Sequence, residues 1–524
     1  MKPAKYFLET FGCQMNILDS QLIEAQLRAR GMTPTTDPRE ADVVLFNTCS
    51  VRQHAEDKVY ARLGHIRRLK TDRPETIVGV VGCMAERARD DLFVRAPHVD
   101  LICGPGELNA LPALIDEVVA RHAHVAALAG SRSRRTRVLQ RALEYDSLEA
   151  LDLSRRPDIE GDILQSYVRV QRGCDKFCAY CVVPFTRGPE RSRPPEHIVR
   201  EAAMLAERGC REITLLGQTV NSYVHQEDGR AVPLARLLER VGSVAGLDRV
   251  RFVTSFPADF DEDIFRVMRD CPQVMPYLHI PAQSGSDRIL KAMRRGYAAA
   301  DYLRLVDRAR EIVPNLALAG DMIVGFCGET DEDFRQSVAL VRRAEYDGLF
   351  VFKYSPRPGT KADRALADDV PDDVKAARNH ELLAVQDEIA LRRKRALIGS
   401  EVEVLVEGLS KAARKAQGES GAQLRSRGKA SPTIPPRKRS AEGRPGRGKP
   451  AGELTRQLVG RTPGDLMAVF EAPADLVGAL VRVRVEDASP HTLFGRVVAV
   501  VSPPRGPWPP AREGGSSGGG LPVL

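Results

Sequence analysis

The sequence predicts a multidomain α/β protein that ends in a small β-barrel, and three observations lead to this fold class. The chain has 524 residues, more than one hydrophobic core usually supports. Strand-like and helical segments alternate up to about residue 394, which is typical of parallel sheets covered by helices. After residue 396 only strand-like segments follow. We therefore expect a doubly wound N-terminal domain, a central partial (β/α)6 barrel similar to a TIM barrel, and a C-terminal β-barrel.

The N-terminal domain is expected over residues 1–120. Four strand-like runs, YFLET, DVVLFNT, TIVGVVG and VDLICG, occupy residues 6–10, 42–48, 76–82 and 99–104. Helical stretches such as residues 20–31 separate these runs, and this alternation predicts a doubly wound domain with a largely parallel sheet. Residues 121–160 are rich in Arg, Ala and Ser and have weak periodicity, so we expect a linker there.

The central domain is expected over residues 161–394, where the alternation resumes with longer units. Six strands are predicted at residues 166–173, 211–218, 249–256, 276–283, 318–326 and 348–355. Four helices are predicted at residues 194–209, 287–297, 301–313 and 330–346. The last of them begins after Thr330, a residue type that caps helices well. Six such units indicate an open barrel, in which the chemistry belongs at the C-terminal ends of the strands.

Residues 395–501 are interpreted as a small β-barrel that low-complexity sequence interrupts. Strand-like segments lie at residues 400–409, 457–471, 476–488 and 493–501. The intervening residues 410–452 are rich in Lys, Arg, Pro, Gly and Ser, and they cannot bury enough apolar surface to fold alone. We therefore expect a disordered insert there, and a second disordered segment in the tail, residues 502–524.

The net charge of +8 originates mainly in the insert. Residues 411–450 hold 12 Lys and Arg against 2 acids, which leaves the rest of the chain close to neutral. No apolar run reaches the roughly 18–20 residues that span a bilayer, and the N-terminus lacks the apolar segment of a signal peptide. The sequence therefore predicts a cytoplasmic protein with no membrane partner.

Three of the ten cysteines lie in one short loop. Cys174, Cys178 and Cys181 directly follow a predicted strand, and in a reducing compartment metal binding or catalysis is a better explanation for them than disulfides. Three thiolates can hold three irons of a four-iron cluster and leave the fourth iron open. A zinc site would need a fourth Cys or His nearby, and the next histidine, His197, lies beyond a proline-rich turn. We therefore predict an iron–sulfur cluster with an open iron.

A second set of cysteines follows the strands of the N-terminal domain. Cys13, Cys49 and Cys83 each come directly after a predicted strand. The carboxyl ends of parallel strands share one edge of a sheet, where α/β proteins bind their ligands, so these thiols can converge. Buried cysteines are also common in such cores, and Cys103, which follows the fourth strand, is a further candidate on the same reasoning. The remaining cysteines are expected to be structural: Cys210, Cys271 and Cys327.

The cysteines stand in longer motifs that resemble the radical S-adenosylmethionine methylthiotransferase family, and specifically its MiaB-type tRNA branch. These motifs are ETFGCQMN (9–16), NTCSVR (47–52), VGCMAE (81–86), GCDKFCAYCVVPFTRGPERSR (173–193), GQTVNSY (217–223), HIPAQSGSDRILKAMRRGY (279–297), DMIVGFCGET (321–330) and YSPRPGTKA (354–362). The resemblance covers residues 5–408 and resumes over residues 456–501.

The resemblance implies a role for each set of cysteines. The three-cysteine loop would bind a [4Fe-4S] cluster that holds S-adenosylmethionine and cleaves it reductively to a 5′-deoxyadenosyl radical. The strand-end cysteines would bind an auxiliary [4Fe-4S] cluster, also with an open iron, that presents the sulfur to be transferred. Cys103 has no counterpart in the family motif, so the resemblance implies that it is not a ligand.

The resemblance also implies the reaction and the partners. The enzyme would insert a methylthio group at C2 of an adenosine just 3′ of the tRNA anticodon that already carries an isopentenyl group. Two molecules of S-adenosylmethionine would be used, one as methyl donor and one as radical source. The partners would be the anticodon stem-loop of tRNA, an electron donor such as flavodoxin or ferredoxin, and a sulfur source. The C-terminal barrel resembles a TRAM domain, an RNA-binding module of this family.

This chemistry requires a pocket that holds the cofactor and the adenine. An unactivated aromatic C–H has no acidic proton, so a radical is needed where a general base cannot act. One aromatic residue of the cysteine loop and several polar residues at predicted strand ends are candidates to line the pocket: Tyr180, Gly217, Gln218, Asn221, Ser255, Gln283 and Ser284. Three arginines after the loop are candidates to meet phosphates or the cofactor carboxylate: Arg187, Arg191 and Arg193. A structural role in a turn, or as a surface charge, is the alternative for each.

Two departures from the family pattern affect these expectations. Cys327 occupies a position where the family usually has Pro, which leaves the geometry of that turn open. The basic insert 410–452 interrupts the TRAM-like barrel and puts the RNA affinity of that module in question. The insert either adds affinity through phosphate contacts or is a tolerated loop.

Two alternatives to the isopentenyladenosine reaction remain at this point. The same chemistry can act on threonylcarbamoyl-adenosine in tRNA or on a ribosomal-protein aspartate, but the CQMN and CVVPFTRG motifs favour the isopentenyladenosine branch. The other alternative is a non-catalytic iron–sulfur protein that binds RNA or carries electrons. Such a carrier would use closed clusters with four cysteines, so two sets of three favour catalysis.

Overall fold

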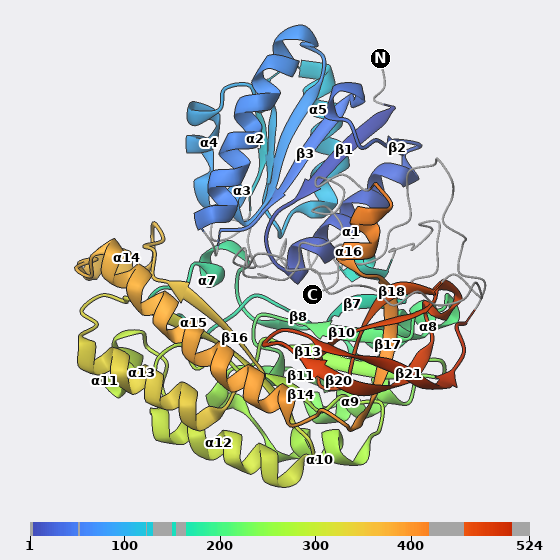
Figure 1. Ribbon diagram of the computed structural model, residues 1–524. Helices are drawn as coiled ribbons and strands as arrows, with labels where there is room; N and C mark the ends of the chain where they lie inside the picture. The colour runs from blue at the N-terminus through green and yellow to red at the C-terminus, as the bar shows by residue number, and fades with distance from the viewer. Residues whose placement is uncertain are drawn as a thin grey trace.

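The computed structural model describes residues 4–50, 53–121, 123–128, 149–153, 164–418 and 455–505. They form an N-terminal α/β domain, a central barrel and a C-terminal β-barrel, drawn in blue, in green to orange, and mainly in red in Figure 1. The predicted fold class is confirmed. Most of the predicted linker, most of the predicted insert and most of the tail lie outside the described residues. Within the described residues, no helix is long and apolar enough to cross a membrane.

The N-terminal domain is built on a sheet of six parallel strands in the order β2-β1-β3-β4-β5-β6. The strands are β1 (Lys5–Thr10), β2 (Thr33–Pro34), β3 (Val43–Thr48), β4 (Ile77–Gly82), β5 (Leu101–Cys103) and β6 (Val125–Ala127). The chain moves from β1 outward to β2 and then returns past β1 to β3. The direction of winding therefore reverses between β1 and β3, which is where doubly wound sheets open a ligand crevice.

Helices cover both faces of this sheet. One face carries α1 (Gln14–Ala29), η2 (Leu108–Ala110) and α5 (Leu111–Arg121), and the other α2 (Gln53–Asp72), α3 (Cys83–Ala88) and α4 (Asp90–Arg95). A short helix, η1 (Pro38–Glu40), precedes β3. Val43 and Leu45 of β3 pack with α1, whereas Val44 and Phe46 pack with α2, because successive strand side chains point to opposite faces.

The central domain contains six parallel strands in two groups of three, β13-β10-β7 and β14-β15-β16. The strands are β7 (Gln165–Arg169), β10 (Glu212–Leu216), β13 (Arg249–Val253), β14 (Tyr277–His279), β15 (Ala317–Val324) and β16 (Gly348–Lys353). A single parallel bridge from Val250 to Val274 connects the two groups. The result is the predicted open barrel.

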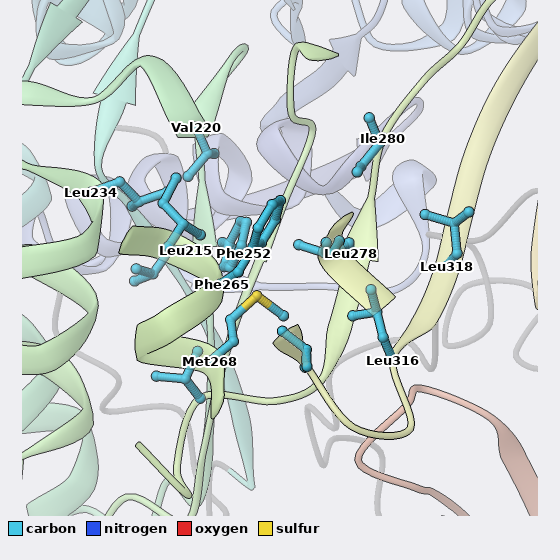
Figure 2. Packing of buried hydrophobic residues seen from close by; sticks show 14 of the residues in the cluster. Leu215, Val220, Leu234, Phe252, Phe265, Met268, Leu278, Ile280, Leu316 and Leu318 are labelled. Atoms are coloured by element: carbon cyan, nitrogen blue, oxygen red, sulfur yellow. The ribbon is translucent and has the colours of Figure 1, made fainter. Parts of the chain in front are cut away.

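An outer layer of helices packs on these strands. It consists of α8 (Pro195–Glu207), α9 (Leu234–Gly242), α10 (Glu262–Asp270), α11 (Asp287–Ala292), α12 (Ala299–Ile312), α13 (Asp331–Ala344) and α15 (Asp372–Arg395). Figure 2 shows Leu215 and Phe252 from the strands against Leu234, Phe265 and Met268 from the helices. Thr330 caps α13 as predicted, because its hydroxyl accepts a hydrogen bond from the backbone N–H of Asp333.

Shorter elements lie in the loops around the barrel. They are β8 (Gln171–Arg172), α7 (Val183–Thr186), β9 (Arg191–Ser192), η3 (Val220–Ser222), β11 (Val224–Glu227), β12 (Arg230–Pro233), η4 (Pro257–Asp259) and α14 (Lys361–Ala365). Of these, α7 lies beside α3, at the junction of the barrel with the N-terminal domain (Figure 1).

The C-terminal domain is a closed barrel in the order β17-β18-β19-β21-β20, and β20 pairs back with β17. Its elements are β17 (Glu401–Leu409), β18 (Thr455–Arg461), β19 (Met467–Pro473), η5 (Ala474–Leu476), β20 (Leu480–Ala488) and β21 (Leu493–Ser502). The first residues of the predicted disordered insert form a helix instead, α16 (Lys411–Ala416). That helix forms because the Ser410 hydroxyl accepts a hydrogen bond from the backbone N–H of Ala413.

The C-terminal barrel docks on the amino ends of the central strands through buried arginines. Arg249 donates to the carbonyl oxygen of Arg461 at 2.7 Å, and Arg251 donates to that of Thr462 at 2.8 Å. Glu407 of β17 is buried at this junction, where it accepts a hydrogen bond from Gln165 at 3.0 Å. The junction therefore contains charged groups that water does not reach.

Glu407→Gln is expected to change how the stability of the protein depends on pH. Burial raises the pKa of Glu407 to about 7, although the charge of Arg461 opposes the shift. The unfolded chain therefore loses this proton at lower pH than the folded protein, and stability falls as pH rises from about 4.5 to about 7. Between pH 5 and 8, the free energy of unfolding of the unchanged protein should fall by about 2 kcal/mol relative to that of the variant, measured by denaturant titration at each pH. Glu403→Gln, on the more exposed part of β17, is the control.

Candidate functional site

The three-cysteine loop lies at the carboxyl end of β7, as predicted. Gly173 opens it with a φ of +69°, and a Cβ there would come within 2.0 Å of the Pro189 carbonyl oxygen. Only glycine fits this turn. The backbone N–H of Cys174 donates to the carbonyl oxygen of Gly188 at 3.1 Å. The backbone N–H of Cys181 donates to the carbonyl oxygen of Cys178 at 3.0 Å. These contacts fold the loop back on itself.

The loop brings its three thiols into one electrostatic environment. Burial raises the pKa of Cys174, and the neighbouring Cys178 raises it further. Burial and the same neighbour raise the pKa of Cys181 to about 12. Within the described residues, no three Cys, His, Asp or Glu side chains lie close enough to hold a single metal ion. Three thiols that contribute one ligand each to three irons fit a four-iron cluster.

A buried arginine that the sequence analysis did not single out contacts this set of thiols. Arg295 donates to the Cys178 sulfur at 3.4 Å and to the carbonyl oxygen of Pro281 at 3.1 Å. Its guanidinium also lies 4.4 Å from the centre of the Phe256 ring. A fixed positive charge beside a thiol stabilises the thiolate that a cluster requires. The only sequence signal for Arg295 was its place in the motif at residues 279–297.

A carboxylate is fixed next to the same loop. Glu190 accepts hydrogen bonds from the hydroxyl groups of Thr219, at 2.9 Å, and Ser222, at 2.7 Å. Thr219 also forms a hydrogen bond with Cys174 that opposes the rise in its pKa, so Glu190 is connected to this thiol through Thr219. An oriented carboxylate in this position can accept hydrogen bonds from an ammonium group. Sequence reasoning considered the arginines around Glu190 and missed the acid itself.

Several predicted pocket residues have side-chain oxygens that lack a partner. Among the described residues, Ser255 Oγ and Gln283 Oε1 are buried without a hydrogen bond, and so is Gln171 Oε1, which sequence reasoning missed. Gln283 also has a φ of +72°, an uncommon conformation for this residue type. Buried polar atoms almost always have partners, so these oxygens are suited to a polar ligand such as a nucleoside.

Other predicted pocket residues are engaged in local structure. Asn221 links two loops, because it donates to the carbonyl oxygen of Phe256 at 2.8 Å and accepts from its N–H at 2.7 Å. Ser284 accepts from the backbone N–H of Ser286 at 3.2 Å. The remaining candidates lie as follows: Gly217 is buried against Gln171, Gln218 is half-buried, and the half-buried Tyr180 packs edge-on against Phe326. Contact of these residues with the cofactor stays a prediction.

The three cysteines of the N-terminal domain converge as predicted. Cys13 ends the segment after β1, Cys49 follows β3, and Cys83 begins α3 after β4, so the set surrounds the switch point of the sheet. A hydrogen bond with Cys49 lowers the pKa of Cys13 to about 6. A Cβ on Gly12 would lie 2.4 Å from the Cys49 Cβ, so glycine is needed for the two thiols to approach. Burial raises the pKa of Cys83, and the nearby Cys13 raises it further.

Two buried asparagines connect the loops that carry Cys13 and Cys49. Asn16 accepts a hydrogen bond from the Cys13 thiol at 3.3 Å and donates to Asn47 Oδ1 at 3.2 Å. Asn47 in turn donates to the backbone carbonyl oxygen of Asn16 at 2.8 Å and to Ser20 at 2.9 Å. Both asparagines are fully buried, so the pair fixes the loops after β1 and β3 relative to each other.

Cys103 does not join this set in the described structure. Its thiol donates to the carbonyl oxygen of Glu107 at 3.2 Å. Burial raises its pKa, and the further contributions come from Glu107 and Glu86 rather than from another cysteine. Cys210 and Cys271 also have local hydrogen bonds, to the Glu212 carbonyl oxygen at 3.2 Å and to Gln273 at 3.5 Å.

The N-terminal domain contacts the barrel next to Cys13. Met15 and Leu18 of α1 pack against Tyr167, Leu216 and Val253 from the barrel strands. Cys13 packs against the same cluster. Both cysteine sets therefore belong to the carboxyl ends of their own sheets, and these ends face each other.

The arginines after the cysteine loop do not all point outward. Arg193 is completely buried and pairs with Glu149 and Glu201, each at 2.8 Å. Its guanidinium is therefore engaged inside the protein, which is the structural alternative and not a contact with a phosphate. Glu149 belongs to a short helical segment, residues 149–153, inside the predicted linker. Arg187 donates to Asp19 of α1 at 2.9 Å, and Arg191 is half-buried in β9.

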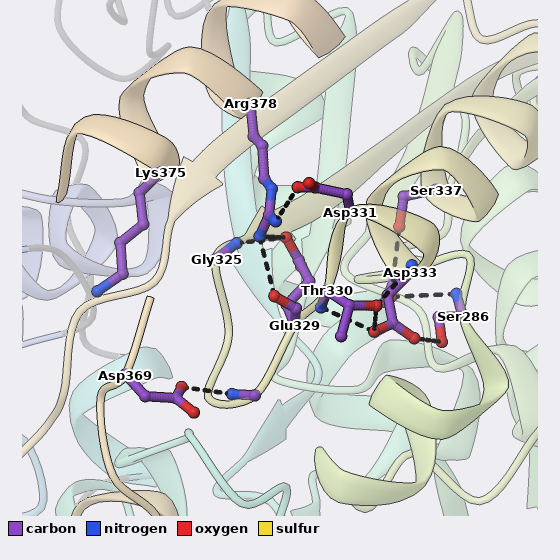
Figure 3. Close-up of polar contacts among 12 residues, drawn as sticks. Ser286, Gly325, Glu329, Thr330, Asp331, Asp333, Ser337, Asp369, Lys375 and Arg378 are labelled. Carbon is purple, nitrogen blue, oxygen red and sulfur yellow. Dashed lines mark hydrogen bonds and ion pairs between the residues drawn. The ribbon is translucent and has the colours of Figure 1, made fainter. Parts of the chain in front are cut away.

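The turn that contains Cys327 is held by polar contacts around it. The backbone N–H of Gly325 donates to Glu329 at 2.9 Å, and Arg378 donates to Glu329 at 2.9 Å and to Asp331 at 2.6 Å. Figure 3 shows these contacts together with Asp333. The turn is therefore closed without the proline that the family usually has there.

Three family models match the chain in order along its length. They are described as "Uncharacterized protein family UPF0004", over residues 5–104, "Radical SAM superfamily", over residues 168–341, and "TRAM domain", over residues 454–498. These matches lie inside the predicted domains 1–120, 161–394 and 395–501.

Curated relatives match nearly the whole chain. A protein of Rhodopirellula baltica named tRNA-2-methylthio-N(6)-dimethylallyladenosine synthase is 45% identical over 495 residues, which is 94% of this chain and 95% of the relative. A protein of the same name from Methylococcus capsulatus is 38% identical over 500 residues, 95% of this chain and 96% of the relative. The solved structure of the radical S-adenosylmethionine methyltransferase TsrM from Kitasatospora setae is 15% identical, with a TM-score of 0.47, over 69% of this chain and 77% of that one. That structural similarity is too low to support a conclusion.

Proposed function

The chain belongs to the tRNA-2-methylthio-N(6)-dimethylallyladenosine synthase family, and from this membership we propose how its residues serve the reaction. The enzyme is a radical S-adenosylmethionine transferase that converts N6-isopentenyladenosine next to the tRNA anticodon to its 2-methylthio derivative. It uses two [4Fe-4S] clusters and S-adenosylmethionine. The observation that supports the assignment of residues best is that each set of three cysteines follows the carboxyl ends of parallel strands, with Cys13 at the contact between the two domains.

Each set of thiols is assigned one cluster. Cys174, Cys178 and Cys181 would hold the cluster that binds S-adenosylmethionine, because they lie at the catalytic end of the barrel. The strand-end cysteines of the N-terminal domain would hold the auxiliary cluster, which carries the sulfur. When bound, these groups supply the one-electron chemistry that replaces an aromatic C–H bond, which no acid or base in the site can do.

The side chains around the clusters bind and orient. Arg295 would place its positive charge beside the Cys178 sulfur, where it offsets the negative charge of a cluster. Glu190 would accept hydrogen bonds from the ammonium group of S-adenosylmethionine, because Thr219 and Ser222 fix both of its carboxylate oxygens. Ser255, Gln171 and Gln283 would accept hydrogen bonds from the ribose hydroxyls or the adenine amino group, because their oxygens have no partner in the described protein.

The partners follow from the same assignment. tRNA is the substrate, and the closed C-terminal barrel corresponds to the matched TRAM domain. A one-electron donor such as flavodoxin or ferredoxin, and a separate sulfur source, are proposed because the reaction consumes both electrons and sulfur. The cytoplasm is the proposed location, since the substrate is a tRNA.

The substrate can be tested by mass spectrometry of tRNA nucleosides. The gene is expressed in cells that lack their own methylthiotransferase, and cells with an empty vector are the control. We expect 2-methylthio-isopentenyladenosine to appear only with the gene. If cluster-loaded protein leaves only isopentenyladenosine, the substrate assignment is wrong, and threonylcarbamoyl-adenosine is the next nucleoside to examine.

A further inference from the structure

Two buried arginines of the barrel lie beside the thiols of the N-terminal domain. Arg187 follows α7, and Arg357 lies in the loop after β16; the Arg187 side chain is 9% exposed, and Arg357 is 6% exposed. Burial lowers the pKa of Arg187, but the nearby Cys83, Asp19 and Cys13 outweigh this effect and raise it. Arg187 directly follows α7, which packs against α3, the helix that Cys83 begins, and a hydrogen bond between Arg187 and Cys83 opposes the rise in the pKa of that thiol.

The backbone and one carboxylate hold Arg187 in this position. Its N–H donates to the carbonyl oxygen of Val183 at 2.8 Å, which ends α7. Its guanidinium donates to Asp19, which is fully buried on α1. Asp19 also pairs with Arg169 of β7, so one carboxylate serves two arginines. The positive charge of Arg187 is therefore only partly neutralised by Asp19 and remains available to the thiols.

Arg357 is the second buried arginine, and one of these thiols also affects its pKa. Burial and the charge of Arg87 lower its pKa, whereas the charges of Glu56 and Cys49 raise it. Cys49 follows β3, and Cys83 begins α3 directly after β4. Both arginines lie in loops at the carboxyl end of the barrel. The thiols and the cations that face them therefore belong to different domains.

We propose that Arg187 is a positioning residue that supplies, from the barrel, the positive charge that stabilises an anionic sulfur ligand on the auxiliary cluster. The proposal rests on the assignment of that cluster to Cys13, Cys49 and Cys83. A cluster on three thiolates that also binds hydrosulfide gains negative charge in a buried site. A fixed guanidinium stabilises that state and the reduced state of the cluster, because both carry the additional charge.

The alternative is that Arg187 only joins the two domains through Asp19. The two roles differ in what Lys does at this position. A lysine keeps the positive charge but cannot reproduce the planar fork that contacts Asp19 and the thiols together. A role in charge stabilisation predicts that Arg187→Lys keeps the properties of the cluster. A purely structural role predicts that the potential does not respond to the charge.

The test uses the full chain with Cys174, Cys178 and Cys181 all changed to Ala, so that only the auxiliary cluster remains. Redox titration followed by electron paramagnetic resonance, and titration with sodium hydrosulfide, are compared for Arg187→Gln and Arg187→Lys in this background. Arg187→Gln should shift the reduction equilibrium at least tenfold toward the oxidised cluster, or 59 mV for one electron. It should also weaken hydrosulfide binding about tenfold. Arg187→Lys should stay within about threefold of the parent in both.

A matched control is Arg73→Gln. Arg73 pairs with Asp42 at 3.1 Å, at the opposite edge of the same sheet, so its loss should leave the potential and hydrosulfide affinity unchanged. An unchanged potential in Arg187→Gln, or equal shifts in the Gln and Lys variants, would overturn the proposal. If Arg187→Gln holds no cluster, a shifted potential in Arg187→Lys overturns it and an unshifted one supports it. None of these measurements uses tRNA, so they are independent of whether the substrate assignment succeeds.

Discussion

Cys174→Ala is expected to abolish the reductive cleavage of S-adenosylmethionine. Cys174 is buried in the loop that begins after Gly173, and its backbone N–H donates to the Gly188 carbonyl oxygen, so its thiol has a fixed place in the set of three. A cluster that loses one of three thiolates leaves an iron without its protein ligand. The measurement is 5′-deoxyadenosine formed under anaerobic conditions with a chemical reductant, and we expect it to fall to the background without enzyme.

Two additional measurements make this result specific. Iron content should fall from two clusters to one, because the auxiliary thiols are untouched. Cys271→Ala is the matched control, since that thiol has only a local hydrogen bond to Gln273. Substantial 5′-deoxyadenosine formation by the Cys174 variant would show that the cluster assignment to this loop is wrong.

Cys49→Ala should separate the two halves of the reaction. The barrel and its three thiols remain intact, so the variant should still form 5′-deoxyadenosine at a rate near that of the unchanged enzyme. Sulfur insertion should cease, because the auxiliary cluster loses a ligand and the Cys13 thiol loses its hydrogen-bond partner. The measurement is 2-methylthio-isopentenyladenosine in a tRNA substrate, followed in the same reaction as 5′-deoxyadenosine.

Cys103→Ala is the matched control for this second prediction. Cys103 is equally buried at the end of the next strand, β5, but its thiol donates to the Glu107 carbonyl oxygen instead of a cysteine. This variant should retain methylthiolation. Full methylthiolation by the Cys49 variant would contradict the assignment of the auxiliary cluster.

The convergence of the N-terminal cysteines could be predicted because a parallel sheet imposes it. Each strand of such a sheet ends at the same edge, so residues about 35 positions apart in sequence become neighbours once the strands are recognised. The same reasoning alone could not exclude Cys103, which follows β5 in an equivalent way. The resemblance to the family excluded it, and the structure agrees, because its thiol is directed to the Glu107 carbonyl oxygen.

The charged groups around both sites could not be predicted in this way. Arg187 and Asp19 are 168 residues apart, and Arg295 and Cys178 are 117 residues apart. An arginine inside such a motif has no periodic signal that reveals its partner. The predicted linker shows the same limit, because the buried Glu149 within it pairs with Arg193 of the barrel.

Local order along the chain was sufficient for the fold class, the strand ends, the three-cysteine loop and the candidate cysteines at the strand ends, whereas the resemblance to the family was needed to exclude Cys103. Those features depend on hydrophobic periodicity and on residue spacing, which the chain carries without reference to any other segment. The tertiary structure decided which cation faces which thiol, and which polar groups at the strand ends remain available for a ligand. These contacts join segments from different domains, and their energies depend on burial and distance, which exist only after the domains have packed together.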